Sequence, residues 1–450
     1  MYKFDFSFFS IEMNWQQLIS NKRLGQEAIH TEHKDDRTEF KRDYDRLIFS
    51  APFRRLQNKT QVFPLPGSVF VHNRLTHSLE VASVGRSLGD AVANALLSKH
   101  PEWTCSSNIS EIGAIVSAAC LAHDLGNPPF GHSGEHAIAS YFLEGPGIKY
   151  KELLTEEQWA DITHFDGNAN TFRLLTHQFK GRRAGGFVLT YSTLSCIVKY
   201  PFPATEAHKQ KFGYFIPEKP IYERIATELG LKRKGAGWCR HPLTYLVEAA
   251  DDICYEIMDI EDAHKLKILS FEKTRDLMLG FIEPEKRTHI IERSKEVDDK
   301  NENVVYFRSC AIGALISECA RVFIDNEEKI LDGEFCGSLI KQSNALIREA
   351  YNACVEVAKS RIYRSRDVID TELSGYKIIS TLIQLFTEAV MNPQHTYSKL
   401  LLDRVSSQYE VDSLDTYERI MAVLDYLSGM TDVFALDLYR KINGESLPMI

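Results

Sequence analysis

Residues 122–137, with the sequence AHDLGNPPFGHSGEHA, concentrate metal-binding and proton-transferring side chains in one short, rigid segment. His123 and Asp124 are adjacent, and His132 and Glu135 follow a few residues later. Imidazoles and carboxylates bind divalent first-row metals, and a histidine held by a carboxylate can carry a proton in catalysis. The segment therefore predicts a metal-dependent hydrolytic centre that acts on a phosphate ester.

Two distant segments supply further ligands for such a centre. His77 lies in HNRLTHSLEV, residues 72–81, and Asp251 lies in LVEAADDICYEIMDIEDAH, residues 246–264. His77 alone would be interpreted as an ordinary core or surface residue. Two histidines and two carboxylates together suit Mg²⁺ or Mn²⁺ better than a closed structural zinc site. Four protein ligands on a six-coordinate ion leave two positions for water and substrate.

His123 and Asp124 can reach one ion only near the end of a helix, because neighbouring helical side chains point ~100° apart. Gly126, followed by Pro128 and Pro129, predicts that end. A carboxylate at a helix C-terminus is unfavourable unless a cation lies beside it. A metal ion would be such a cation.

His132 and Glu135 are three residues apart, which is one turn of a helix that begins after Gly131. A carboxylate at that distance orients the imidazole and raises its pKa. A capping or surface pair is the alternative interpretation.

The helix predicted around Asp251 places Tyr255 and Asp259 on the same face, at spacings of four and eight residues. This stripe could present a metal ligand, a ring and a second carboxylate to one substrate, although a solvated acidic face is a common alternative. Arg74 lies one turn before His77 and could bind a phosphate through two hydrogen bonds. Lys199 is a second phosphate-binding candidate.

Composition excludes several classes of protein. The chain has 450 residues, 44% hydrophobic and 26% charged, and a formal net charge of −9. An acidic protein of this kind is not a dedicated nucleic-acid binder, and no apolar run is long enough to span a membrane. Nine cysteines without regular spacing indicate reduced thiols in the cytoplasm.

Hydrophobic periodicity predicts an all-α fold, with at most a short hairpin around Pro66 and Gly67. We divide the chain into residues 1–40, an N-terminal extension and helix; 41–270, a catalytic core; and 271–450, a C-terminal helical region continuous with the core. The stretch 201–240 is predicted to form loops and one short helix. The other predicted helices are residues 75–97, 110–125, 243–266, 305–324, 336–361 and 375–392.

The order His77, His123-Asp124, Asp251 resembles the pattern that names the HD-domain hydrolases. Longer strings are more specific, and together they resemble the deoxyguanosine triphosphate triphosphohydrolases of bacterial type. These strings are RRLQNKTQVFPL (54–65), NRLTHSLEV (73–81), AHDLGNPPFGHSGE (122–135), HFDGNANTFRLL (164–175), KYPF (199–202) and EAADDICY (248–255).

The resemblance implies a role for most of these residues. It makes His77, His123, Asp124 and Asp251 the metal ligands, and His132 the acid–base catalyst with Glu135 as its partner. It places His164 on phosphate and Tyr255 and Asp259 on the deoxyribose, with Asp259 accepting from the 3′-hydroxyl. Gln57 and Gln61 both lie in the segment that contacts base or sugar, and Gln61 is preferred. Asn127 matches the residue found at this position in the bacterial branch of the family.

The implied reaction converts dGTP and water to deoxyguanosine and tripolyphosphate with a divalent metal, Mg²⁺ or Mn²⁺. The implied partners are further copies of the chain, in an assembly such as a hexamer, and single-stranded DNA as an effector. Two alternatives share the metal residues: another HD-domain enzyme, such as a nucleotidase or phosphodiesterase, and a nucleotide-sensing assembly without catalysis. The His132–Glu135 pair disfavours the second, because a pure binder needs no proton carrier.

The predicted metal site can be tested by replacing one of its ligands. Asp124→Ala should abolish metal binding and turnover together, because it removes a ligand and the charge beside His123. Metal content by atomic absorption, measured with the hydrolysis rate, checks this. Near-normal turnover at unchanged metal content would show that the site is assigned wrongly.

Overall fold

The computed structural model describes residues 13–28, 37–64, 71–104, 108–207 and 210–446. Within these ranges the chain is helical, and the only sheet is an antiparallel pair of two-residue strands, β1 (Arg233–Lys234) and β2 (Gly237–Trp238). The all-α prediction is confirmed. No helix in the described ranges is long and apolar enough to cross a membrane.

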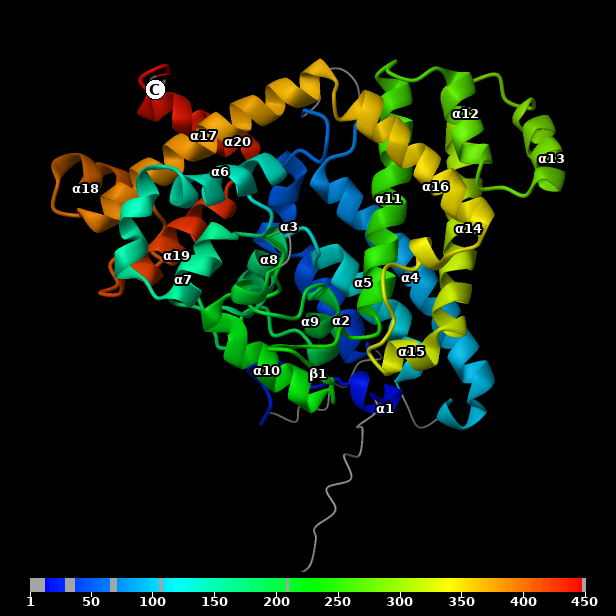
Figure 1. Cartoon of the computed structure of the whole chain (residues 1–450), viewed down its shortest axis with the longest axis horizontal. Helices are drawn as coiled ribbons and strands as arrows, with labels where there is room; N and C mark the ends of the chain where they lie inside the picture. The colour runs from blue at the N-terminus through cyan, green and yellow to red at the C-terminus, as the bar shows by residue number, and fades with distance from the viewer. Residues whose placement is uncertain (1–12, 29–36, 65–70, 105–107, 208–209, 447–450) are drawn as a thin grey trace, which may run out of the picture.

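The α-helices before residue 270 form the first group in chain order and those after it form the second, and helices of the two groups lie side by side in the molecule (Figure 1). The first group is α1 (Trp15–Leu18), α2 (Glu39–Ile48), α3 (Ala51–Arg55), α4 (Arg74–Lys99), α5 (Ile112–Ala122), α6 (His132–Leu143), α7 (Glu156–Thr163), α8 (Gly167–Thr176), α9 (Tyr191–Ile197), α10 (Lys219–Glu228) and α11 (Thr244–Lys265). The second group is α12 (Phe271–Leu279), α13 (Pro284–Ser294), α14 (Lys300–Asp325), α15 (Glu327–Leu331), α16 (Ala345–Val357), α17 (Arg366–Met391), α18 (Thr396–Leu402), α19 (Thr416–Ser428) and α20 (Asp432–Ile442).

Helix α5 lies at the centre of the first group. Its sequence, IGAIVSAACLA, is apolar on every side, as expected of a helix that is buried all round. It packs against α4 at very short range: a Cβ atom added to Gly89 of α4 would lie 2.7 Å from the Cα atom of Gly113. Helix α4 also contacts α11 and α14. The first turns of α4, the end of α5 and the middle of α11 can therefore meet at one place.

The helix predicted over 110–125 ends earlier than expected, at Ala122. Gly126 does not end it. A Cβ atom at Gly126 would lie 2.1 Å from the backbone nitrogen of Thr171, so glycine is needed here because the loop passes directly against α8. The same loop is held to α8 by a hydrogen bond of 2.9 Å from Gly126 N to Thr171 Oγ1.

Predicted helix bounds also shift in the second group. Helix α16 begins at Ala345, after Asn344 caps it by accepting from Ile347 N, so residues 336–344 lie outside that helix. Helix α17 begins earlier than predicted, at Arg366. Its first turns face solvent and a cavity, so they lack the apolar spacing on which the prediction depended. The turn of the predicted hairpin lies outside the described residues, although Thr60 and Asn73 form an antiparallel bridge.

Two hydrophobic clusters form the core, and each includes residues from both sides of position 270. One contains Leu121, Ile253 and Phe323, and the other contains Phe142 and Phe386. The second cluster forms where α17 packs against α6 and α19. The domain limits at residues 40 and 270 stay predictions.

A buried ion network joins α8 to α19. Arg173, which is 4% exposed, donates to Asp425 Oδ1 and Oδ2 at 2.8 and 2.7 Å and to Glu218 Oε1 at 2.7 Å. Burial lowers the pKa of Arg173, but the charges of Asp425 and Glu218 outweigh that effect and raise it. Arg173 therefore keeps its charge, and it joins the side chains of Asp425 and Glu218 in one buried network.

Arg173→Ala should lower the free energy of unfolding by about 3–5 kcal/mol, because two carboxylates would remain buried without their cation. Urea denaturation followed by circular dichroism measures this change. The control is Lys441→Ala, which breaks an exposed pair with Asp437 of 2.7 Å on α20 and should cost less than about 1 kcal/mol. Equal losses in the two variants would contradict the prediction.

Candidate active site

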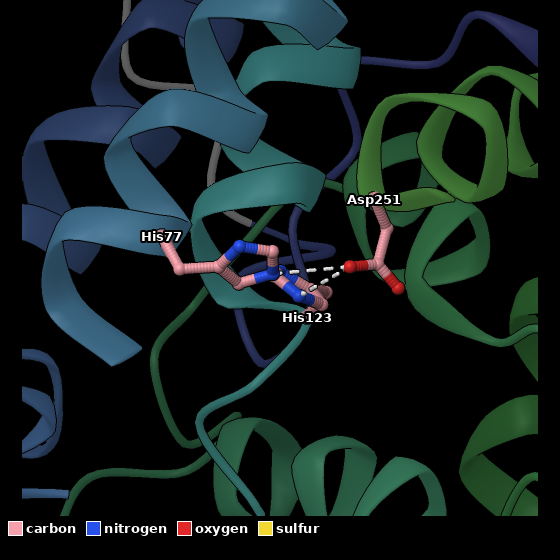
Figure 2. Close-up of side chains that lie close together, drawn as sticks. All are labelled: His77, His123 and Asp251. Carbon is pink, nitrogen blue, oxygen red and sulfur yellow. Dashed lines mark hydrogen bonds and ion pairs between the residues drawn. The ribbon is translucent and has the colours of Figure 1, made fainter. Parts of the chain in front are cut away.

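Three predicted metal ligands come together at the junction of α4, α5 and α11. His77 lies in the first turns of α4, His123 follows α5 directly, and Asp251 lies on α11. Figure 2 shows the Asp251 carboxylate facing both imidazoles. Asp251 Oδ1 is 3.1 Å from His77 Nε2 and 3.4 Å from His123 Nε2. One ligand atom from each residue lies within 4.8 Å of the other two, so the set could hold a metal ion.

The hydrogen bonding of the His123 ring is the kind expected of a metal ligand. Its Nδ1 donates to the carbonyl oxygen of Cys120 at 2.6 Å, while its Nε2 is buried without a hydrogen-bond partner. Such a bond on one ring nitrogen commonly orients the other toward a metal. Burial lowers the pKa of His123, but the charges of Asp124 and Asp251 outweigh it and raise the pKa to about 9. The site thus favours positive charge at this nitrogen, as a proton or as a cation.

Asp124, the fourth predicted ligand, lies beside this cluster. Its Oδ1 is 3.6 Å from His123 Nε2, and its Oδ2 accepts from Arg74 Nη1 at 2.7 Å. Asn127 Nδ2 also donates to Oδ1. Burial raises the pKa of Asp124, but the Arg74 guanidinium outweighs it and holds the pKa below its usual range. Arg74 is thus the cation that this carboxylate at the helix end requires.

A cavity of 550 Å³ opens beside the cluster. Its volume lies within the range of small-molecule sites. Most of the residues singled out from the sequence line it, namely Gln61, Arg74, His123, Asp124, Asn127, His132, Glu135, Lys199, Asp251 and Tyr255. Gln57, the alternative to Gln61 for the contact with base or sugar, is exposed and does not line this cavity.

Three predicted site residues do not line the cavity. His77, a member of the candidate metal cluster, is buried and only 1% exposed. His164 Nδ1 donates to the carbonyl oxygen of Ala160 at 2.9 Å. Asp259 accepts a 2.8 Å hydrogen bond from the hydroxyl of Tyr363, and Tyr363 lines the cavity. The predicted contacts of His164 with phosphate and of Asp259 with sugar stay predictions.

His132 and Glu135 form the expected pair at the start of α6. His132 Nδ1 is 2.9 Å from Glu135 Oε2, and Glu135 Oε1 accepts from Gly167 N at 2.6 Å. Lys211 lies 3.7 Å from Glu135 Oε2 and 3.2 Å from Asp166 Oδ1. Burial raises the pKa of Glu135, but His132 and Lys211 outweigh it and lower the pKa to about 2. The hydrogen bond to Glu135 in turn raises the pKa of His132.

The sequence interpretation missed several residues that line the cavity. Lys211 lies in a loop, and Tyr363, Thr371 and Glu372 lie far along the chain. None of them belongs to a local motif. Only the packing of α17 against α6 and the course of the loop before α10 bring them to the site.

Comparison with known proteins agrees with this geometry. The HD domain family matches residues 74–166, and the phosphohydrolase-associated domain family matches residues 341–441. A deoxyguanosinetriphosphate triphosphohydrolase-like protein of Pseudomonas aeruginosa is 37% identical over 454 residues, covering 97% of this chain and all of the relative. A Synechocystis protein of the same name is also 37% identical, with the same coverage. A deoxyguanosinetriphosphate triphosphohydrolase of Yersinia enterocolitica is 29% identical, covering 96% of this chain and 99% of the relative.

The chain belongs to the deoxyguanosinetriphosphate triphosphohydrolase-like family. It is an HD-domain hydrolase. The matched HD segment contains His77, His123 and the His132–Glu135 pair, whereas Asp251 lies beyond it. The phosphohydrolase-associated segment contributes Tyr363 and Glu372 to the cavity wall, so residues from both matched segments line one site.

The contact between His132 and Glu135 leads to a prediction about the pKa of His132. Glu135→Gln should lower the pKa of His132 toward its ordinary value of about 6.5, because the charged partner is lost. Lys211→Gln should move the pKa of His132 the other way, because the Lys211 charge lowers it. NMR titration of histidine-labelled protein measures both. An unchanged pKa in Glu135→Gln would show that the pair does not control the proton.

Proposed function

We propose that this protein is a metal-dependent dNTP triphosphohydrolase that acts preferentially on dGTP. One observation carries the proposal: His123 and Asp251 of the three-ligand cluster line a cavity that is also lined by the His132–Glu135 pair and by Arg74, Lys199 and Lys211. Three cations beside a divalent site suit a polyanionic triphosphate. The names of the relatives support the same substrate class.

His77, His123 and Asp251 would hold the ion, with Asp124 as the expected fourth ligand, and Mg²⁺ or Mn²⁺ suits this nitrogen and oxygen set. A bound divalent ion would polarise a phosphate oxygen and lower the pKa of a water molecule.

In the proposed reaction, water forms a bond to the α-phosphorus, and the bond from that phosphorus to the 5′-oxygen breaks. The products are a deoxynucleoside and tripolyphosphate. His132 would give a proton to the departing 5′-oxygen, since Glu135 keeps its imidazole oriented and its pKa raised. Arg74, Lys199 and Lys211 would offset the charge of the triphosphate.

We assign the deoxyribose to the wall formed by Tyr255 and Tyr363, whose rings lie 6.2 Å apart. The Tyr255 ring would leave little room for a 2′-hydroxyl. Asp259 lies behind this wall and holds the Tyr363 hydroxyl. Gln61 and Asn127 line the same cavity and remain candidates for contacts with the nucleotide. A cytoplasmic location, a homo-oligomer such as a hexamer, and a single-stranded DNA effector stay predictions.

The test is product and substrate analysis with each dNTP and Mg²⁺ or Mn²⁺. We expect tripolyphosphate as product, with dGTP hydrolysed best and with GTP and 2′,3′-dideoxy-GTP slower by roughly 10²- to 10⁴-fold. A site built to pair a hydroxyl rejects the analogue that lacks it, because a buried polar group is then left unpaired.

Two variants locate the hydroxyl contact. Asp259→Ala should narrow the difference between dGTP and the dideoxy analogue, and Tyr363→Phe should do the same by removing the hydroxyl that Asp259 holds. Orthophosphate or pyrophosphate as product would indicate another HD-domain reaction. Equal rates on all three nucleotides would overturn the preference for deoxynucleotides.

A further inference from the structure

Glu248 on α11 lies in a wall between two cavities. It lines the active-site cavity and also a second cavity of 850 Å³. Its Oε1 is 3.1 Å from Lys199 Nζ, which lines the first cavity, and its Oε2 is 3.0 Å from Arg240 Nη1, which lines the second. One carboxylate therefore joins a cation of the active site to a cation outside it.

The local environment keeps this chain of charges in place. The side chain of Glu248 is 11% exposed, and those of Lys199 and Arg240 are 25% and 23% exposed. The Arg240 guanidinium lies 5.7 Å from the ring of Tyr200 and 5.4 Å from that of Tyr245. A partly buried ion pair is screened less than a surface pair, so a change at one end is felt at the other.

The charge of Glu248 is divided between its two partners. If Arg240 were absent, the carboxylate would be paired with Lys199 alone, and the ammonium would be held more tightly away from an incoming phosphate. If Glu248 were absent, the Lys199 ammonium would lose its ion pair at the cavity wall. Glu248 and Arg240 therefore both affect how tightly Lys199 can bind an anionic ligand.

We propose that Glu248 and Arg240 are positioning residues for Lys199. Glu248 holds the Lys199 ammonium at the cavity wall, and Arg240 competes for the same carboxylate, which weakens the Glu248–Lys199 pair so that Lys199 can bind the triphosphate. This inference rests on the proposed function, since it assumes a triphosphate in the first cavity. The proposal requires no contact of Glu248 or Arg240 with the substrate. Their effect passes through Lys199 and concerns binding of the anion more than the chemical step.

The main experiment measures kcat and KM for dGTP in Arg240→Gln. KM should rise by roughly 3- to 10-fold while kcat stays within about 2-fold, which is the signature of binding lost equally from the ground state and the transition state. Arg240→Lys keeps the positive charge and should restore most of the wild-type KM. The control is Arg348→Gln, which alters an exposed cation of the same second cavity whose Nη1 donates to the carbonyl oxygen of Ser343. This control should leave both constants unchanged.

Glu248→Gln gives a second, independent readout. Burial lowers the pKa of Lys199, but the charge of Glu248 outweighs it and raises the pKa, with smaller contributions from Tyr200, Asp252 and Asp251. Without Glu248 the pKa should fall, so Lys199 should lose its proton at a lower pH. KM should then increase with pH in this variant over a range where the wild-type KM stays constant.

The outcomes separate the two proposals. A wild-type KM in Arg240→Gln would overturn the positioning role while leaving the proposed function intact. The same conclusion would follow if Arg348→Gln or Arg240→Lys raised KM as much as Arg240→Gln does. A pH-independent KM in Glu248→Gln would do the same. Folded wild-type protein that releases no tripolyphosphate from any dNTP would overturn the proposed function and this inference with it. Circular dichroism melting confirms that each variant is folded.

Discussion

The close approach of α4 and α5 is the constraint on which the site depends. Gly89 and Gly113 let the two helices pack almost backbone to backbone, and α11 packs against both. Side chains from the three helices can then converge within 4.8 Å. A side chain larger than hydrogen at the crossing would push α4 and α5 apart, and interhelical distances are otherwise 8–10 Å. The candidate metal cluster thus depends on packing well outside it.

The cavity keeps its cations paired with carboxylates. Arg74 is paired with Asp124, Lys199 with Glu248, and Lys211 with Asp166 and Glu135. Buried charges are costly unless they are paired, so this arrangement lets a site for a polyanion remain folded without its ligand. A triphosphate would have to compete with these carboxylates for the same cations. The pairs therefore influence both stability and affinity.

The C-terminal region completes the site from a distance. Lys59 donates to the carbonyl oxygens of Asn127 and Ser428 at 2.6 and 2.8 Å, so α19 is tied to the loop that follows His123 and Asp124. Asp432 at the start of α20 accepts from Thr60 N at 2.7 Å and from Phe130 N at 2.9 Å. These bonds hold Asn127 and Phe130 in place, two residues before His132. The phosphohydrolase-associated segment is accordingly part of the active site's structure.

The amino-acid sequence predicted the helical character of the chain, which is confirmed, and it named the residues of the candidate metal site, which stay predictions as ligands. Helical periodicity located α4 and α11 to within a few residues, because amphipathic spacing is a local property. His77, His123 and Asp251 were selected because their residue types suit a metal and because the family resemblance favours those positions. The spacing of His132 and Glu135 predicted their contact because one helical turn sets it.

Only the tertiary structure decided the rest. The sequence contains no signal that Lys211 lies beside Glu135, that Tyr363 covers Asp259, or that Glu248 joins Lys199 to Arg240. These contacts join residues far apart along the chain, and each depends on how loops and helices pack. Gly126 shows the same limit, since its role comes from the approach of α8 and not from its own backbone conformation. Local patterns encode local geometry, whereas contacts between distant elements follow from packing that no short motif records.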